Sequence, residues 1–359
     1  MKKYITFLST ILCCSSLLAK TITVSNNPNS PGQFTRLDSA ILLASAGDIL
    51  LVSGSVTDYA AIAGGTITIN KPITLYGAGY DPRNDQALAT VVSTIHITTA
   101  GSGTTISGLY ISNEIYEDGG TNNITISRCK ISSMWNNGSY TNGINGNNYN
   151  INENIIGVIA ISVYNTTTPI SDIIIQNNLI TGSIGGPSTG SNIIISNNYF
   201  SGSNPLTATG YAGALYNANI YNNIFYYKST TSTTAAGATT NCVFSNNIYF
   251  NNTNSNPFNI GINNNSGSNN INANPDFVNI DLTTTSITRL DNFNLKLGSP
   301  GIGTGTDGKN IGPEGGSIPI QYPYTGYSAI PVIDSMSISN PVIPPNGTLK
   351  VKFTAHANN

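Results

Sequence analysis

The acidic side chains that could take part in binding chemistry gather in one short stretch. Glu114, Tyr116, Glu117 and Asp118 lie within five residues, and Trp135, the single tryptophan of the chain, follows on the next repeat. Neighbouring carboxylates could hold Ca²⁺, and an indole ring could stack on a sugar ring. We therefore take these five residues as a candidate ligand-binding site; a merely solvated acidic turn is the alternative.

The other ionisable residues do not assemble a catalytic set. His96 stands alone in a stretch rich in Thr and Ile, and His356 lies near the C-terminus, so no Ser-His-Asp arrangement can be built. The Asp pair of a glycoside hydrolase and the pattern of a pectin esterase are both missing. The two cysteines that follow the N-terminal apolar run, Cys129 and Cys242, are too far apart for a thiolate metal site. The sequence thus predicts no catalytic residue and no dedicated metal ligand.

Charge is scarce throughout the chain. Charged residues make up 8% of the sequence, with 14 basic against 16 acidic, and no basic stripe is present. Nucleic acid is therefore not expected as a partner.

The N-terminus predicts export. Lys2 and Lys3 precede an apolar run over residues 5–18, and Ala19 can occupy a cleavage position. We interpret residues 1–19 as a signal peptide, which predicts a secreted, extracellular or cell-surface protein. The run is short for a membrane span, so we expect none in the mature chain.

The elements that must position any site are repeats. Residues 171–183 and 191–203 are identical at eight of thirteen positions, 20 residues apart. A fixed period of about 20 to 25 residues is typical of a solenoid. Each unit is short, β-branched and rich in Gly and Asn, which favours strands and bends over helices.

The repeats can be aligned on the second Asn of each Asn-Asn pair. This column comprises Leu109, Cys129, Asn154, Asn178, Asn198, Asn223, Asn247 and Asn274. Hydrophobic residues recur three positions before and two positions after it, so both flanking columns should point inward. The Asn side chains should turn the chain between strands and form an amide ladder from rung to rung.

The ends of the repeat region carry a resemblance. A predicted helix over residues 31–47, with a capping box at Thr35 and Asp38, precedes the strand 48–54 and the segment Thr-Ile-Thr-Ile-Asn-Lys-Pro-Ile-Thr-Leu-Tyr-Gly-Ala-Gly at 66–79. This entry, and the closing segment over 272–316, resemble secreted bacterial right-handed parallel β-helix proteins of the pectin-lyase-like fold. The resemblance implies a right-handed parallel β-helix of roughly ten coils, with a capping helix at its start.

These observations predict an all-β chain in three parts. Residues 1–19 are the signal peptide, 20–316 the β-helix domain with its N-terminal cap, and 317–359 a Pro-rich linker with a short β tail. Strands are expected at about 333–339 and 348–354. They could form an added hairpin, pair with the last rung or serve as a recognition tail.

The aligned register places four further residues. Cys129 and Cys242 fall five rungs apart, on the order of 24 Å, which predicts free, buried and unreactive thiols. Arg128 and Glu153 occupy the same column on adjacent rungs. They should form a surface ion pair worth about 0 to 1 kcal/mol.

The predicted function follows from these features. We expect an exported, non-catalytic β-helix protein that binds a polysaccharide or cell-surface glycan, or that serves in adhesion. The alternative, which rests on fold analogy, is a polysaccharide lyase or related enzyme acting on uronate-containing polysaccharide. Ice or mineral binding by flat Thr rows is a third option. It is disfavoured because the outward column of Thr68, Thr105 and Thr125 is not continued.

Overall fold

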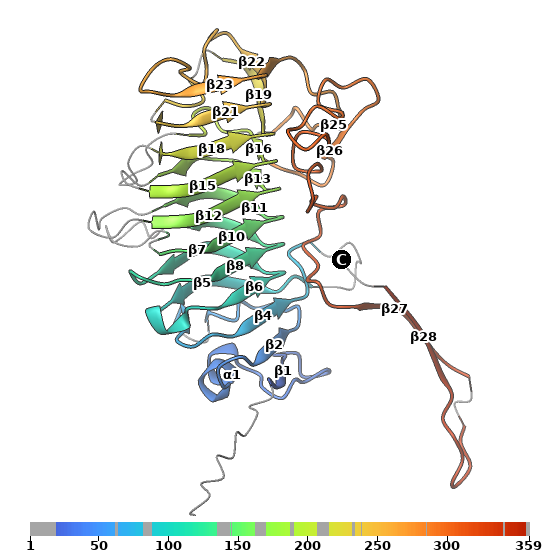
Figure 1. Cartoon of the computed structure of the whole chain (residues 1–359). Helices are drawn as coiled ribbons and strands as arrows, with labels where there is room; N and C mark the ends of the chain where they lie inside the picture. Colours follow the sequence, from blue (N-terminus) through green and yellow to red (C-terminus); the bar gives the residue numbers. More distant parts are fainter. Residues whose placement is uncertain are drawn as a thin grey trace, which may run out of the picture.

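The chain folds as an all-β parallel solenoid (Figure 1). This computed structural model describes residues 19–61, 64–81, 88–134, 144, 146–161, 170–186, 190–206, 215–231, 234–237, 239–284, 286–339 and 342–356. Within these ranges, no helix is long and apolar enough to cross a membrane. The predicted signal peptide lies almost entirely outside them.

Two long parallel sheets form the walls of the solenoid. Sheet 1 runs in the order β1 (Thr21–Val24), β2 (Ile49–Val52), β4 (Thr74–Gly77), β6 (Thr105–Ser107), β8 (Ile124–Ser127), β10 (Tyr149–Asn152), β12 (Ile170–Gln176), β15 (Gly190–Ser196), β18 (Ala218–Tyr221), β21 (Val243–Ser245) and β23 (Ser266–Ser268). Sheet 2 runs in the order β3 (Ile67–Ile69), β5 (Val91–Ile97), β7 (Tyr110–Glu117), β9 (Lys130–Met134), β11 (Ile155–Ala160), β13 (Leu179–Ile180), β16 (Tyr199–Phe200), β19 (Ile224–Thr231), β22 (Ile248–Asn252) and β24 (Ile271–Asn272). The eleven stacked strands of sheet 1 agree with the expected number of coils.

Smaller elements flank the two walls. β14 (Ile184–Gly185) pairs in parallel with the end of β11, and the short strands β17 (Leu215–Tyr216) and β20 (Thr239–Thr240) pair in parallel with each other. Two antiparallel pairs follow the solenoid, β25 (Phe277–Asn279) with β26 (Asn292–Leu295) and β27 (Val332–Ile338) with β28 (Val351–His356). Two helical elements lie entirely within the described ranges, α1 (Leu37–Leu43) and the 3₁₀ turn η2 (Thr99–Gly101).

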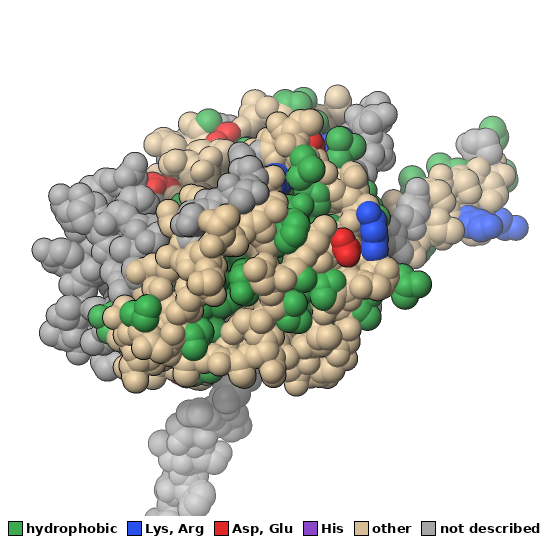
Figure 2. All heavy atoms as spheres, turned by 90° about the horizontal axis from the view of Figure 1, so that it is seen from above, with side chains coloured by type: hydrophobic (Ala, Val, Ile, Leu, Met, Phe, Trp, Pro, Cys, Tyr) green, Lys and Arg blue, Asp and Glu red, His purple; other side chains and the backbone are tan. Residues whose placement is uncertain are grey.

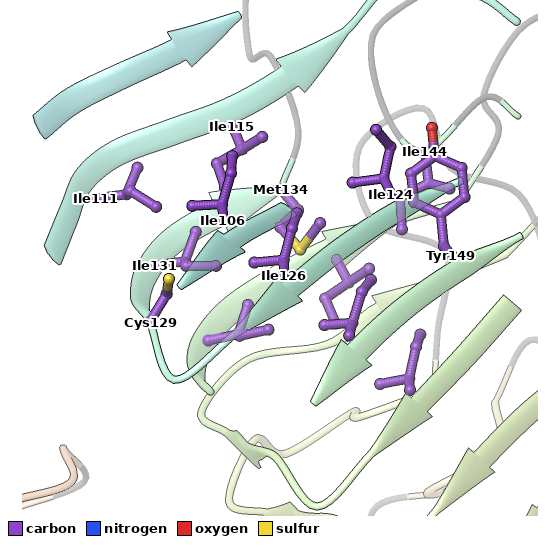
Figure 3. Close-up of a cluster of buried hydrophobic side chains, with 14 of the residues drawn as sticks. Ile106, Ile111, Ile115, Ile124, Ile126, Cys129, Ile131, Met134, Ile144 and Tyr149 are labelled. Atoms are coloured by element: carbon purple, nitrogen blue, oxygen red, sulfur yellow. The ribbon is translucent and has the colours of Figure 1, made fainter. Parts of the chain in front are cut away.

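The predicted inward columns are confirmed over most of their length. Ile126 pairs in register with Ile106 and Ile151, and all three side chains are fully buried. Figure 3 shows Ile106, Ile111, Ile126 and Ile131 together in the interior. No single rung could bury these side chains alone, so stacking supplies the core.

The Asn ladder is also confirmed. Asn178 donates to the side-chain oxygen of Asn198 through its backbone N–H at 2.9 Å and through Nδ2 at 3.0 Å. The same pair of hydrogen bonds, from the backbone N–H and from Nδ2, is donated to the next Asn by Asn154, Asn198, Asn223 and Asn247. The ladder thus satisfies backbone donors at a buried corner where no sheet partner is available.

One detail of the ladder was predicted wrongly. The last member is Asn270, which accepts from Asn247, and the expected Asn274 plays no part in it. Ile271, placed in the inward column of sheet 1, pairs instead with Ile248 in sheet 2. Gly267 takes the inward position opposite Phe244.

The sharp turn and the ladder belong to different residues of each Asn pair. Left-handed backbone angles occur at the first residue, for example at Asn177 and Asn197 (φ 54° and 53°). The ladder uses the second residue. Asn tolerates the left-handed region because its short side chain can bond locally. We had assigned both roles to the second Asn.

The N-terminal cap differs from its prediction. Helix α1 spans only seven residues, its N-cap is Arg36, and no side chain caps it, so the predicted box at Thr35 and Asp38 is wrong. Asp38 instead pairs with Arg36. The solenoid begins before the helix, at β1, and Phe34 bonds to Thr23 and Ser25 along the outer edge of that strand. Strand β1, this edge segment and α1 together cover the first rung.

The segment after the last rung returns along the outside of the solenoid. We name residues 304–328 the C-terminal strap. Its path is fixed by the first Asn of successive pairs: Asn246 donates to the Thr304 carbonyl, Asn222 bonds with Thr306, Asn197 with Gly312, and Asn177 with Pro313 and Gly315. At the far end, Ser328 donates to the carbonyls of Gly77 and Ser107 at 2.6 and 3.1 Å.

The strap includes most of the region expected to be a linker. Within residues 317–332, the side chains of Ile320, Tyr324 and Ser328 are buried. With the β25–β26 pair, the strap covers an outward row of sheet 2 that includes Leu179 and Tyr199 and forms a second hydrophobic cluster. The Pro-rich segment is therefore packed against the solenoid as far as Ser328.

The tail strands agree with their prediction. β27 and β28 form a hairpin that pairs only with itself within the described residues, and it points away from the solenoid (Figure 1). Figure 2 looks onto the end of the solenoid where β23 lies. Backbone and uncharged polar atoms dominate this face, with scattered hydrophobic side chains and few charges.

Candidate functional site

The acidic cluster predicted from the sequence is divided by the wall of the solenoid. In β7 the side chains of Ile115 and Glu117 face inward, whereas Glu114, Tyr116 and Asp118 lie at least partly on the outside. Glu117 is only 2% exposed. The prediction that Glu117 belongs to a surface carboxylate patch is therefore wrong. Trp135 lies outside the described residues, so its part in a site stays a prediction.

The buried Glu117 carboxyl belongs to a small polar group inside the core. It is hydrogen bonded to the Tyr149 hydroxyl, which also donates to the Thr121 carbonyl at 2.8 Å. Burial raises the pKa of Glu117 to about 8. The hydrogen bond that the Tyr149 hydroxyl donates to Glu117 opposes this shift.

The outward residues of β7 form a different group. The rings of Tyr116 and His96 stack with centroids 4.5 Å apart and 15° between their planes. His96 Nε2 lies 2.9 Å from Asp118 Oδ1. Burial raises the pKa of Tyr116, and the negative charges of Glu114 and Asp118 add to this. His96 is thus held in a stack on the surface of β5 and β7, as expected for a structural or surface histidine.

A hollow on the same outer wall was not foreseen. It has a volume of about 400 Å³. We name it the hydroxyl groove, because its floor consists of small residues, mostly with hydroxyls: Ser112, Ser132, Gly157, Thr181 and Ser201. Each lies three positions after a ladder residue, on β7 to β16 or just beyond a strand end. This small-residue column was visible in the aligned repeats and could have been found there.

The sides of the hydroxyl groove supply an aromatic ring, a cation and apolar groups. Tyr110 and Lys130 lie next to each other on β7 and β9, with the ammonium 5.3 Å from the ring centroid. Ile155 and Ile287 line the side toward the C-terminal segment. Lys228 fixes the loop that carries Ile287, because its ammonium donates to the carbonyls of Asp281, Thr284 and Ser286.

Arg128 and Glu153 do form the predicted pair, but not on the surface. Arg128 Nε donates to Glu153 Oε2 at 3.0 Å, and the two side chains are 16% and 8% exposed. Burial raises the pKa of Glu153, and the hydrogen bond from Arg128 opposes that shift. The strap crosses over this pair, so the small energy expected for a solvated ion pair does not apply.

The cysteine prediction is confirmed. Cys129 and Cys242 are free and buried. Cys129 occupies the ladder column, where its N–H donates to Asn154 Oδ1 at 2.8 Å and its sulfur accepts from the Leu109 N–H at 3.5 Å. Burial raises the pKa of the Cys129 thiol to about 12. The two thiols are structural.

Metal and acid-base chemistry find little support in the described part of the chain. No group of three or more His, Cys, Asp or Glu side chains gathers there in a geometry for a metal ion. The inward turn of Glu117 also removes one carboxylate from the Ca²⁺ site considered above. The outer wall offers hydroxyls, an aromatic ring and the Lys130 ammonium beside the groove.

Comparison with known proteins adds no relative. No family model matches the chain, and no curated protein matches it.

Proposed function

We propose that this chain is an exported, non-catalytic parallel β-helix protein of the pectin-lyase-like type that binds a glycan. The hydroxyl groove is the proposed binding site. The observation that carries the proposal is the row of Ser112, Ser132 and Thr181 along the wall, beside the Tyr110 ring.

The geometry of the groove suits a sugar chain. Its floor residues repeat once per rung, at a spacing of about 4.8 Å that is close to the length of one pyranose unit. Hydroxyl side chains both donate and accept hydrogen bonds, as sugar hydroxyls do. A tyrosine ring supplies an apolar face for the C–H groups of a sugar. The low charge of the chain agrees with a largely uncharged ligand surface.

The proposal is tested by filling the groove. Ser132 is exposed, so Ser132→Trp should leave the fold intact and block the hollow. A glycan array followed by calorimetry on the ligands found should show binding by the natural chain and its loss in this variant. Thr125→Trp, on the outer face of sheet 1, is the matched control and should bind normally. Equal binding by all three proteins, or none by the natural chain, would refute the groove as the site.

Lys130 favours one alternative function. A polysaccharide lyase needs a cation to neutralise the uronate and a base to remove a proton, and Lys130 is the one cationic side chain among the described residues of the groove. A panel of uronate polymers, followed by the ultraviolet absorbance of unsaturated products with and without Ca²⁺, tests this. Turnover that disappears in Lys130→Gln would replace the binding-only proposal.

A further inference from the structure

The first residue of each Asn pair has a left-handed backbone conformation, and at two rungs this position is not Asn. The first residue of each pair is Asn at Asn177, Asn197, Asn222 and Asn246, but Arg128 and Glu153 take this place on the two preceding rungs. Their φ angles are 53° and 55°. Asn tolerates this region through its short polar side chain, whereas Arg and Glu have no such compensation and cost more there. Asn at both positions would be the less strained choice.

A cavity opens where the column changes. Along the Asn rungs the strap lies on the side-chain amides, at distances of 2.8 Å from Asn177 and Asn246. Over Arg128 and Glu153 the strap and the solenoid border an open cavity of about 250 Å³. The charged pair forms part of its lining. Where the column is Asn, the strap packs directly on the side chains; where it is Arg128 or Glu153, a cavity lies between the strap and the solenoid.

The walls of this strap cavity combine rings with polar groups. Tyr80, Tyr324 and Tyr327 contribute rings, and Gln321 contributes an amide. The backbone of Gly326 passes so close to Tyr80 that a Cβ there would lie 2.1 Å from the ring. This close approach is open only to glycine, whose φ at this position is +68°. Gly326 thus allows the strap to close over the cavity.

The Arg128–Glu153 ion pair is expected to contribute little to the free energy of unfolding. Glu153 is nearly removed from water, and burying an ion pair usually costs as much as the attraction between the charges returns. Charged residues make up only 8% of the sequence, yet one of each sign lines this cavity. Arg128 and Glu153 present donors and acceptors next to each other with no net charge.

We propose that the strap cavity binds a single uncharged, polyhydroxylated ring, such as a monosaccharide or the terminal unit of a glycan. Neighbouring hydroxyls on a pyranose each donate and accept, which matches the adjacent guanidinium and carboxylate. The tyrosine rings match the apolar C–H faces of the sugar. The volume of about 250 Å³ suits a single ring.

The strap cavity and the hydroxyl groove are distinct hollows, and a third hollow between them shares Tyr80 and Tyr324 with the first and Lys130 and Ile155 with the second. The two hollows share no lining residue. Either proposal can therefore fail without the other.

The test titrates the natural full chain with glucose, galactose, mannose, fucose and N-acetylglucosamine, observed by saturation-transfer NMR and calorimetry. At least one sugar should bind saturably. The double substitution Arg128→Asn and Glu153→Asn restores the Asn column, so the protein should fold and melt at the same temperature or higher. Because two charged hydrogen-bonding groups are removed, its affinity should fall at least about tenfold.

Two single variants give an independent measurement. Tyr327→Ala removes a cavity wall and should weaken the same sugar, whereas Tyr322→Ala removes a neighbouring ring outside the lining and should not. Ser132→Trp should leave monosaccharide binding unchanged. Failure of all five sugars to bind the natural chain overturns the proposal. Natural affinity in the double variant does so as well.

Discussion

The amide oxygen of Asn198 accepts two hydrogen bonds from Asn178, one from its backbone N–H and one from its side chain. Asn198 also donates onward to Asn223 and to the Ile175 carbonyl. Its side chain is fully buried. One side chain therefore satisfies groups on three rungs, and the corner of the solenoid depends on every member of the row.

Replacing Asn198 by Ala should be strongly destabilising. The substitution leaves the Asn178 N–H and the Ile175 carbonyl buried without their partner, at about 1 to 3 kcal/mol for each group. Chemical denaturation should show a loss of at least about 3 kcal/mol in the free energy of unfolding. Asn219→Ala, at an exposed outward position of β18, is the control and should stay within about 0.5 kcal/mol. A loss of similar size in both variants would show that the ladder has no special role.

Cys129 should accept replacement by Asn. In the ladder column its N–H already bonds to Asn154, and an Asn side chain there could accept from the Leu109 N–H in place of the sulfur. Cys129→Asn should therefore keep the thermal midpoint or raise it. Cys129→Ala should lower it, because the Leu109 N–H then loses its acceptor. A large loss in the Asn variant would show that this rung is too narrow for the amide.

The native thiols should be unreactive. With the Cys129 thiol pKa raised to about 12 by burial, almost none of it is thiolate at neutral pH. Burial also raises the pKa of Cys242. A thiol-specific reagent should label the folded protein at the rate of unfolding and label both residues at once in denaturant. Rapid labelling of the folded chain would contradict the buried positions.

Much of this architecture could be predicted from the sequence, because it is periodic. The aligned repeats place Ile126, Ile151 and Ile175 in one inward column, and the structure pairs them in that register. The inward position of Glu117 was available too, since it follows Ile111 and Ile115 at even spacing. Alternation along the strand therefore outweighs the charge of this side chain.

The strap could not be predicted in the same way. Asn177 and Gly315 are 138 positions apart, and Ser328 and Gly77 are 251 apart. No repeat relates the strap to the rungs it touches, and its Pro-rich composition is typical of linkers. The strap cavity depends on it and was therefore invisible in the sequence. The hydroxyl groove could be predicted in part. Its floor residues recur once per repeat, whereas Ile287 comes from the non-repetitive C-terminal segment.

Stability should depend on pH through Glu117. Its folded pKa of about 8 lies above the ordinary value of 4.5, so between these values the native state holds a proton that the unfolded state releases. The free energy of unfolding should be highest below pH 4.5 and fall as pH rises toward 8, by at most about 1.4 kcal/mol per unit. Glu117→Gln should reduce this slope and leave the part due to Glu314, whose pKa burial raises to about 7. Glu114→Gln, on the outward side of β7, should keep it, and an unchanged slope in Glu117→Gln would refute the assignment.

The strap should stabilise the solenoid, whereas the terminal hairpin should not. A chain that ends after Ile330 keeps Ser328 in its seat on Gly77 and loses only β27 and β28, so its thermal midpoint should match that of the full chain. A chain that ends after Gly316 loses the buried Ile320 and Tyr324 as well, at about 1.5 to 3 kcal/mol for each side chain. Its midpoint should fall, and limited proteolysis should cut near the uncovered Tyr80. Equal midpoints for the two shortened chains would mean that residues 317–330 act as a linker, as their composition suggested. The hydrogen bond from Ser328 to Gly77 would then contribute nothing to the stability of the fold.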